Sequence, residues 1–357
     1  MEKDSLRVIK GILVFICILL TLAVLKICSG KLIPLVIAVF LFILVNPLLD
    51  KMEKVKIPKV LSGFLVLLLI AMILFLFVYV MVTMVNLLLA KLPEYVMKVS
   101  RFDQYVSERI RNVFSMELEE FPSILSVLNI DWFGYVKSML SSASSLTATF
   151  IGNGAMILLY LLFMLMERAT LEPKMEAAFT KGQRATDMLT NISHQTSRYL
   201  YVKVMISGAT GILFYLTALI SGMDFPMVWG VSAFLLNFIP TIGSIVVTVV
   251  ATFMAAVQFM PNWGIVIGLF FVFMMIEMVL GNVLDPKISG VQLNLSPLVI
   301  LIMLTLWGYI WGIVGMFLAV PITSVLQVVC VSIPSLKPVA IILSTGTIYN
   351  KKDEGEN

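Results

Sequence analysis

Two long apolar stretches of this chain are interrupted by residues that end or break helices. The first covers Pro226–Met260 and is broken at Asn237–Ser244, and the second covers Pro297–Val331. A bilayer offers no water to backbone N–H and C=O groups, so irregular backbone at membrane depth occurs only where protein buries it or where it lines a cavity. Interrupted apolar segments in two parts of one chain therefore indicate the substrate site of a membrane transporter.

The composition supports a membrane protein, because hydrophobic residues make up 60% of the chain and charged residues only 13%. An ordinary soluble domain is about half apolar and about a quarter charged. Mean hydropathy is +1.03. We therefore predict an all-α, polytopic integral membrane protein with about eight spans, including interrupted or re-entrant helices, that forms a single transporter domain over residues 1–357.

A spanning helix needs about 20 apolar residues. The uninterrupted runs near or above that length are Gly11–Cys28, Leu32–Leu49, Val60–Ala90, Thr149–Met166, Val204–Ser221 and Ile265–Leu284. Asn46-Pro47 marks the end of the second run, because a residue before proline disfavours helix. Val60–Ala90 is longer than a bilayer requires, so we expect it to tilt or to project beyond the membrane.

Lysine and arginine set the expected orientation. The N-terminus, the loop after the second run and residues 167–203 carry most of the short-loop lysines and arginines, which places all three in the cytoplasm together with the C-terminus. Residues 167–203 are predicted to form an amphipathic segment along the membrane surface. It contains the single histidine, His194, which we interpret as solvated or capping.

Residues 91–147 fall on the outer side and are predicted to form a helical arm. Apolar residues recur from Tyr95 to Val113 at spacings of three and four, the period of an amphipathic helix. A second helix is expected near Asp131, which can cap its N-terminus. The arm is interpreted either as a surface element packed on the membrane domain or a neighbouring subunit, or as a domain that captures substrate.

Three ionisable residues lie in or beside an apolar run, where a charge is a functional hypothesis by default. Glu277 has no cation at the i±3 or i±4 positions, and it shares a helix face with Gly281. Desolvation disfavours its charged form, as a proton- or cation-coupled carrier requires. The alternative is a carboxylate that only fixes helix packing. For Asp285 and Lys287 the competing interpretation is an ion pair or a helix end at the interface.

The two interruptions supply polar groups and freed backbone, and half-helix ends of this kind can orient a polar solute or an ion. The candidate pathway residues of the first interruption are Asn237, Pro240, Thr241, Gly243 and Ser244. Those of the second are Gly312, Gly315 and Pro321. A tryptophan–glycine pair precedes each proline at nearly equal distance, which suggests an internal repeat.

Other classes of function lack their motifs. The chain has no GxxxxGK[ST] phosphate loop, no HExxH and no GxSxG, so we expect neither an ATPase engine nor an enzyme. One histidine and three scattered cysteines make no metal site. Basic residues follow the positive-inside rule, which leaves no separate patch for nucleic acid.

Four motifs resemble, in order and spacing, those of the AI-2E family of bacterial transporters, named for autoinducer-2 export. They are Val45–Glu53 followed by Ile57–Lys59, Leu236–Gly243, Asn282–Gly290 followed by Leu295–Leu298, and Gly312–Ile322. The resemblance adds Asn282 to the candidate pathway. One position differs: many relatives carry an acidic residue where this chain has Leu280, and Glu277 lies one turn earlier.

The resemblance implies a secondary transporter of the bacterial inner membrane that forms a homo-oligomer, described as a pentamer. Some members are described as exporters of autoinducer-2, and others as sodium– or lithium–proton antiporters. The implied partners are the lipid bilayer and a small-molecule or ion substrate, with H⁺ or Na⁺ as transported species rather than resident cofactors. Two further hypotheses are a passive channel, and a membrane scaffold in envelope or spore assembly that works through residues 91–147.

Overall fold

The computed structural model describes residues 2–114, 134, 138, 141, 151–168, 170, 174, 182–285, 287, 295–333 and 336–345. Every named element in these residues is a helix. The chain divides into two compact units. The first unit comprises residues 1–70, 153–201 and 289–357, and the second unit comprises residues 71–152 and 202–288.

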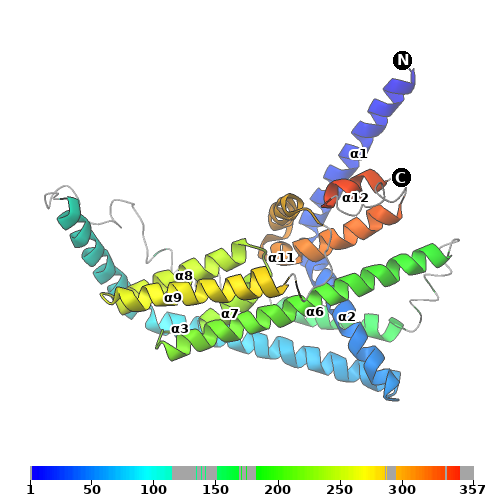
Figure 1. Cartoon of the computed structure of the whole chain (residues 1–357). Helices are drawn as coiled ribbons and strands as arrows, with labels where there is room; N and C mark the ends of the chain where they lie inside the picture. Colours follow the sequence, from blue (N-terminus) through cyan, green and yellow to red (C-terminus); the bar gives the residue numbers. More distant parts are fainter. Residues whose placement is uncertain are drawn as a thin grey trace, which may run out of the picture. The chain divides into compact units, whose positions relative to one another are not determined.

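The helices are shown in chain order in Figure 1. They are α1 (Glu2–Ile27), α2 (Ser29–Lys54), α3 (Lys59–Phe114), an unlabelled helix (Ile151–Arg168), α6 (Gly182–Ile220), α7 (Pro226–Leu236), α8 (Ile242–Phe259), α9 (Trp263–Glu277), the π-helix η1 (Met278–Leu284), α11 (Pro297–Ser332) and α12 (Lys337–Leu343). Among the described residues, seven helical segments are long and apolar enough to cross a membrane. The predicted all-α polytopic fold is confirmed, and the count of about eight crossings stays a prediction.

Helix α3 is longer than the sequence indicated. Its 56 residues run without a break through Pro93, a length of about 84 Å against a hydrocarbon core of about 30 Å. The predicted projection and the first helix of the arm are therefore one continuous helix up to Phe114. The second arm helix expected near Asp131 lies almost entirely outside the described residues.

The first unit is held together by contacts between α1, α2 and α11, and between α11 and α12. Arg168 donates hydrogen bonds to Asn46, Asp50 and Glu53 of α2. The expectation that Asn46-Pro47 ends the second span is wrong, because α2 continues to Lys54 with proline inside it. Asn46 instead orients an arginine, since its Oδ1 accepts from Arg168 Nε at 2.8 Å.

The core of the second unit lies among α6, α7, α8 and α9, and α7–α8 and α8–α9 are packed neighbours (Figure 1). Phe214 of α6 and Phe273 of α9 stack with ring centroids 4.6 Å apart, and both are fully buried. Gly211 of α6 and Gly230 of α7 let the two helices approach backbone to backbone. Small residues at such a crossing permit the close approach on which packing inside membranes depends.

Replacing Gly211 with alanine should destabilise the second unit, because the added Cβ would lie 2.7 Å from the carbonyl oxygen of Gly230. We expect a loss of about 1–3 kcal/mol, the usual cost of overfilling a packed contact. Gly208→Ala is the matched control on the same helix, since no described atom lies within 4 Å of a Cβ added there. Thermal unfolding in detergent measures the difference, and equal melting temperatures for the two variants would contradict this packing.

Candidate functional site

The interruption between α7 and α8 is present where the sequence predicted it. Helix α7 ends at Leu236, and the N–H of Ile242 donates to the carbonyl of Pro240 at 2.6 Å. This bond closes a three-residue γ-turn centred on Thr241, whose φ of 62° and ψ of −52° put a non-glycine residue in the left-handed region. A γ-turn of this hand is rare and strained. Strain of this kind concentrates at functional sites.

Gly243 allows the chain to turn so tightly. A Cβ at this position would coincide with the carbonyl group of Leu236, so only glycine fits. The carbonyl of Ile239 accepts a hydrogen bond from the N–H of Gly243 at 3.1 Å. The interruption is thus a tightly turned piece of backbone that presents Ser244 at the first turn of α8.

Glu277 faces this interruption from the end of α9. The hydroxyl of Ser244 donates to Oε2 of Glu277 at 2.7 Å, and the glutamate is only 8% exposed. Its other oxygen, Oε1, is buried and has no hydrogen-bond partner among the described residues. Gly281 lies beside this carboxylate, since a Cβ added to it would be in ordinary van der Waals contact with Oε2, at 3.9 Å. A buried carboxylate with one free oxygen can accept a proton, a cation or a solute hydroxyl.

Asn237 makes the second polar contact at the interruption. Its Nδ2 donates to the hydroxyl of Ser207 at 3.1 Å, and both side chains are buried. Glu277 lies about 21 Å from the start of α9, Ser207 about 20 Å from the end of α6, and Asn237 about 17 Å from the start of α7. The chain turns and the hydrogen bonds of Gln258 connect these helix ends, so the polar groups lie at similar distances along their helices.

A partly buried ion pair lies further along the same helices. Lys203 Nζ is 3.2 Å from Oδ2 of Asp285, and the lysine is only 6% exposed. Its charge also acts electrostatically on Glu277. Asp285 thus has the ion-pair role that was the competing interpretation of the sequence. It follows η1, whose π-helical turns often occur at functional sites.

Sequence reasoning missed Ser207 and Lys203. The basic-residue count assigned Lys203 to the cytoplasmic segment, but it lies within the apolar helix Gln195–Ile220. A signal was available, because Lys203, Ser207 and Thr210 recur at spacings of four and three. Such spacing places polar side chains along one helix face.

The other predicted residues have no described contact that assigns them to this cluster. Lys287 has an exposed side chain, and Asn282 lies in η1, where only its backbone is described. The remaining candidates, Gly312, Gly315 and Pro321, belong to the first unit. No three His, Cys, Asp or Glu side chains in the described ranges are grouped so that they could hold a metal ion.

The second interruption is a reversal at Gly312, whose φ of 63° and ψ of −144° are open only to glycine. A Cβ on Gly315 would overlap the carbonyl of Trp307, so the two segments of α11 pack against each other. Pro321 was expected to break this stretch, and that was wrong because it is buried inside the helix. The repeat therefore does not relate the two prolines. Gly243 and Gly315 share one feature, because each accommodates a carbonyl from the preceding segment.

An all-helical chain with several apolar spans and a buried carboxylate beside an interrupted helix defines a polytopic membrane protein of the transporter class. The model of the family described as AI-2E family transporter matches residues 15–334. The chain therefore belongs to the AI-2E transporter family.

Its relatives carry transport names. A "putative transport protein" of Borreliella burgdorferi is 33% identical over 94% of this chain and 92% of its own length. The "AI-2 transport protein TqsA" of Escherichia coli is 26% identical over 92% of this chain and 95% of its own length. A "putative transport protein" of Haemophilus influenzae is 26% identical over 96% of this chain and 98% of its own length. The chain is thus similar to transport proteins over nearly its whole length.

Proposed function

We propose that this protein is a secondary transporter that exports a small polar solute such as autoinducer-2, through a site at the interruption between α7 and α8. The observation that carries the proposal is Glu277, a buried carboxylate with one unpartnered oxygen beside a broken helix. The name of the E. coli relative supports autoinducer-2 as the first solute to test. Because the sequence has no phosphate loop, a solute or ion gradient is the expected driving force.

The polar groups of the site suit a solute with several hydroxyls. Ser244 and Glu277 offer a donor and acceptors at one end, and Asn237 with Ser207 offers an amide and a hydroxyl at a similar distance along their helices. The unpartnered Oε1 of Glu277 leaves one acceptor for a solute hydroxyl, whose hydrogen bond would satisfy that buried oxygen. The ion pair of Lys203 and Asp285 adds fixed charge further along.

A second candidate function is exchange of sodium or lithium for protons. The free oxygen of Glu277 favours it, because a proton and a hard cation compete for the same carboxylate. In both cases we place the protein in the bacterial inner membrane with both termini in the cytoplasm. We also propose a homo-oligomer, a pentamer by resemblance to the family.

Purified protein in liposomes with a trapped pH dye separates these functions. An imposed sodium gradient should change internal pH if the protein exchanges cations for protons, and labelled autoinducer-2 should leave loaded vesicles if it exports that solute. Either activity must saturate with solute, since a passive channel would not. The transporter proposal fails if neither activity exceeds that of protein-free vesicles, and a scaffold that works through residues 91–147 would then be favoured.

A further inference from the structure

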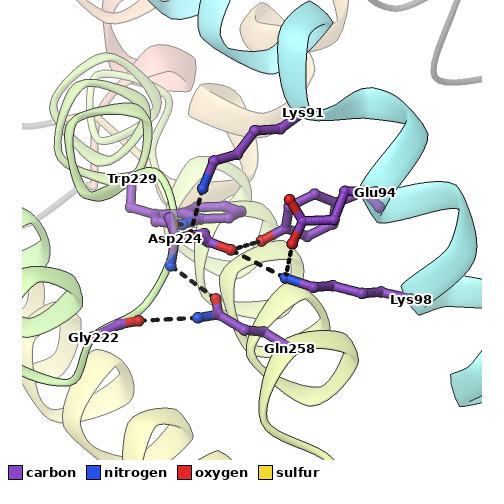
Figure 2. Close-up of polar contacts among 8 residues, drawn as sticks. Lys91, Glu94, Lys98, Gly222, Asp224, Trp229 and Gln258 are labelled. Carbon is purple, nitrogen blue, oxygen red and sulfur yellow. Dashed lines mark hydrogen bonds and ion pairs between the residues drawn. The ribbon is translucent and has the colours of Figure 1, made fainter.

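Asp224, in the turn between α6 and α7, gathers three donors from a single helix (Figure 2). Its carboxylate accepts from Lys91 Nζ at 2.9 Å, from the Tyr95 hydroxyl at 2.8 Å and from Lys98 Nζ at 3.3 Å, all on α3. Glu94 pairs with Lys98 at 2.8 Å, which balances two cations with two carboxylates. Tyr95, Lys98, Glu94 and Asp224 lie outside the candidate spans, and Lys91 is the last residue of one. The cluster is not part of the Glu277 site.

The backbone around Asp224 forms the base of the α7–α8 hairpin. Gln258, near the end of α8, accepts from the N–H of Asp224 at 2.8 Å and donates to the carbonyl of Gly222 at 2.9 Å (Figure 2). The indole N–H of Trp229 donates to the carbonyl of Asp224 at 3.0 Å. Gln258 therefore ties the start of α7 to the end of α8. We call 222–225 and Gln258 the hairpin base, and 237–241 the hairpin tip.

Apolar contacts join the hairpin base to α3 as well. Tyr95 and Phe225 have ring centroids 5.1 Å apart, and Phe102 meets Phe253 of α8 edge-on at 5.8 Å. Tyr95, Phe225 and Val257 are all buried in this contact. The base thus has hydrogen bonds, ion pairs and apolar contacts to α3. The tip is a strained turn, and its Asn237 has one side-chain hydrogen bond, to Ser207 of α6.

We propose that Asp224 is a positioning residue that anchors the hairpin base to α3, so that the tip moves during transport while the base stays in place. The inference that the tip moves rests on the proposed function, because a moving tip at Asn237 and Thr241 would open and close the site. The inference that Asp224 anchors the base to α3 concerns the second unit alone and does not depend on transport.

The anchor should hold over a wide range of pH. Burial alone would raise the pKa of Asp224, but the hydrogen bonds from Lys91, Tyr95 and Lys98 outweigh it and lower the pKa below its ordinary 3.8. Burial and then the bond to Asp224 raise the pKa of Tyr95 well above its ordinary 10.0. Because the pKa of Asp224 is lowered on folding, its ionised form stabilises the folded protein at pH values above 3.8. Because the pKa of Tyr95 is raised on folding, its protonated form stabilises the folded protein at pH values below 10.0.

We therefore expect the anchor to be unchanged from about pH 5 to about pH 9. The other groups facing Asp224 are Lys91, Glu94 and Lys98 of α3, with uncharged Gln258 and Trp229 from the hairpin. Hydrogen exchange of the backbone amides at 222–225, corrected for the intrinsic effect of pH on exchange, measures whether the anchor is unchanged over this pH range. A loss of protection within that range would contradict it.

Spin-label distances test the anchor directly. In a background with Cys17, Cys28 and Cys330 replaced by serine, labels at the exposed pair Met97 and Met227 report the base, and labels at Met97 and Ile242 report the tip. We expect one narrow base distance in the otherwise unchanged protein, with or without autoinducer-2 or sodium, and a tip distance that shifts with one of them. Asp224→Ala should broaden the base distance, whereas Asp224→Glu should restore it.

Glu94→Gln is the matched control, because it removes a carboxylate of the same cluster that pairs with Lys98 rather than with the base. Asp224→Ala should also lower the transport rate about tenfold, with Glu94→Gln near the wild-type rate. The anchor is overturned if the base distance shifts with solute, or if it stays narrow in Asp224→Ala. Motion of the tip is overturned if the tip distance does not change with any solute. The base distance needs no transport, so it tests the anchor even if the proposed function fails.

Discussion

Replacing Glu277 with glutamine should lower transport about 100-fold, equivalent to about 2.7 kcal/mol. Glutamine has nearly the same shape, and its amide oxygen can still accept the hydrogen bond that Ser244 donates at 2.7 Å. The substitution removes only the charge and the ability to bind a proton at the buried, unpartnered oxygen. Initial rates of autoinducer-2 efflux and of sodium-driven pH change in liposomes measure the loss.

The control for this variant is Glu94→Gln, which removes a carboxylate outside the spans. Equal thermal stability of the two variants would show that the loss is not one of folding. Transport by Glu277→Gln at the wild-type rate would mean that the carboxylate only fixes packing between α8 and α9. That was the alternative interpretation of Glu277 from the sequence.

Replacing Gly243 with alanine should have the largest effect on stability. The added Cβ would occupy the position of the Leu236 carbonyl group, which belongs to backbone and cannot rotate away. The hairpin tip would have to move, and we expect a loss of about 3 kcal/mol or more, at the upper end for overfilled sites. Thermal unfolding in detergent and the recovery of folded protein measure it.

Gly268→Ala is the control for this substitution, because no described atom lies within 4 Å of a Cβ added to that glycine of α9. Alanine is the better helix former, so Gly268→Ala should be neutral or stabilising by up to about 1 kcal/mol. If Gly243→Ala unfolds at the same temperature as Gly268→Ala, that result would contradict the close contact between Gly243 and the Leu236 carbonyl group at the interruption.

The first interruption and Glu277 could be predicted because each breaks a local rule. Pro240 and Gly243 stand inside an otherwise apolar stretch, and a lone carboxylate stands in another. The partner of each polar group could not be predicted, because Ser207 and Asn237 are 30 residues apart and Lys203 and Asp285 are 82 apart. Such pairs depend on how helices cross, which local pattern does not encode.

Prolines misled the sequence interpretation more than glycines did. Pro47, Pro93 and Pro321 all lie inside helices, although two of them were expected to end or break one. A proline removes one hydrogen bond, and neighbouring groups in a membrane helix can compensate for it. The actual reversals are at Thr241 and Gly312, where φ is positive and the helix cannot continue.

The most direct measurement is thiol labelling of Ser244→Cys in the cysteine-free background described above. Ala251→Cys, fully buried two turns further along α8, is the control that should stay unlabelled. If solute passes the interruption beside Glu277, the thiol at position 244 should react with a water-soluble reagent in liposomes, and autoinducer-2 or sodium should slow that reaction. A thiol that is never labelled, or whose labelling none of these solutes alters, would contradict a transport pathway between α7 and α8.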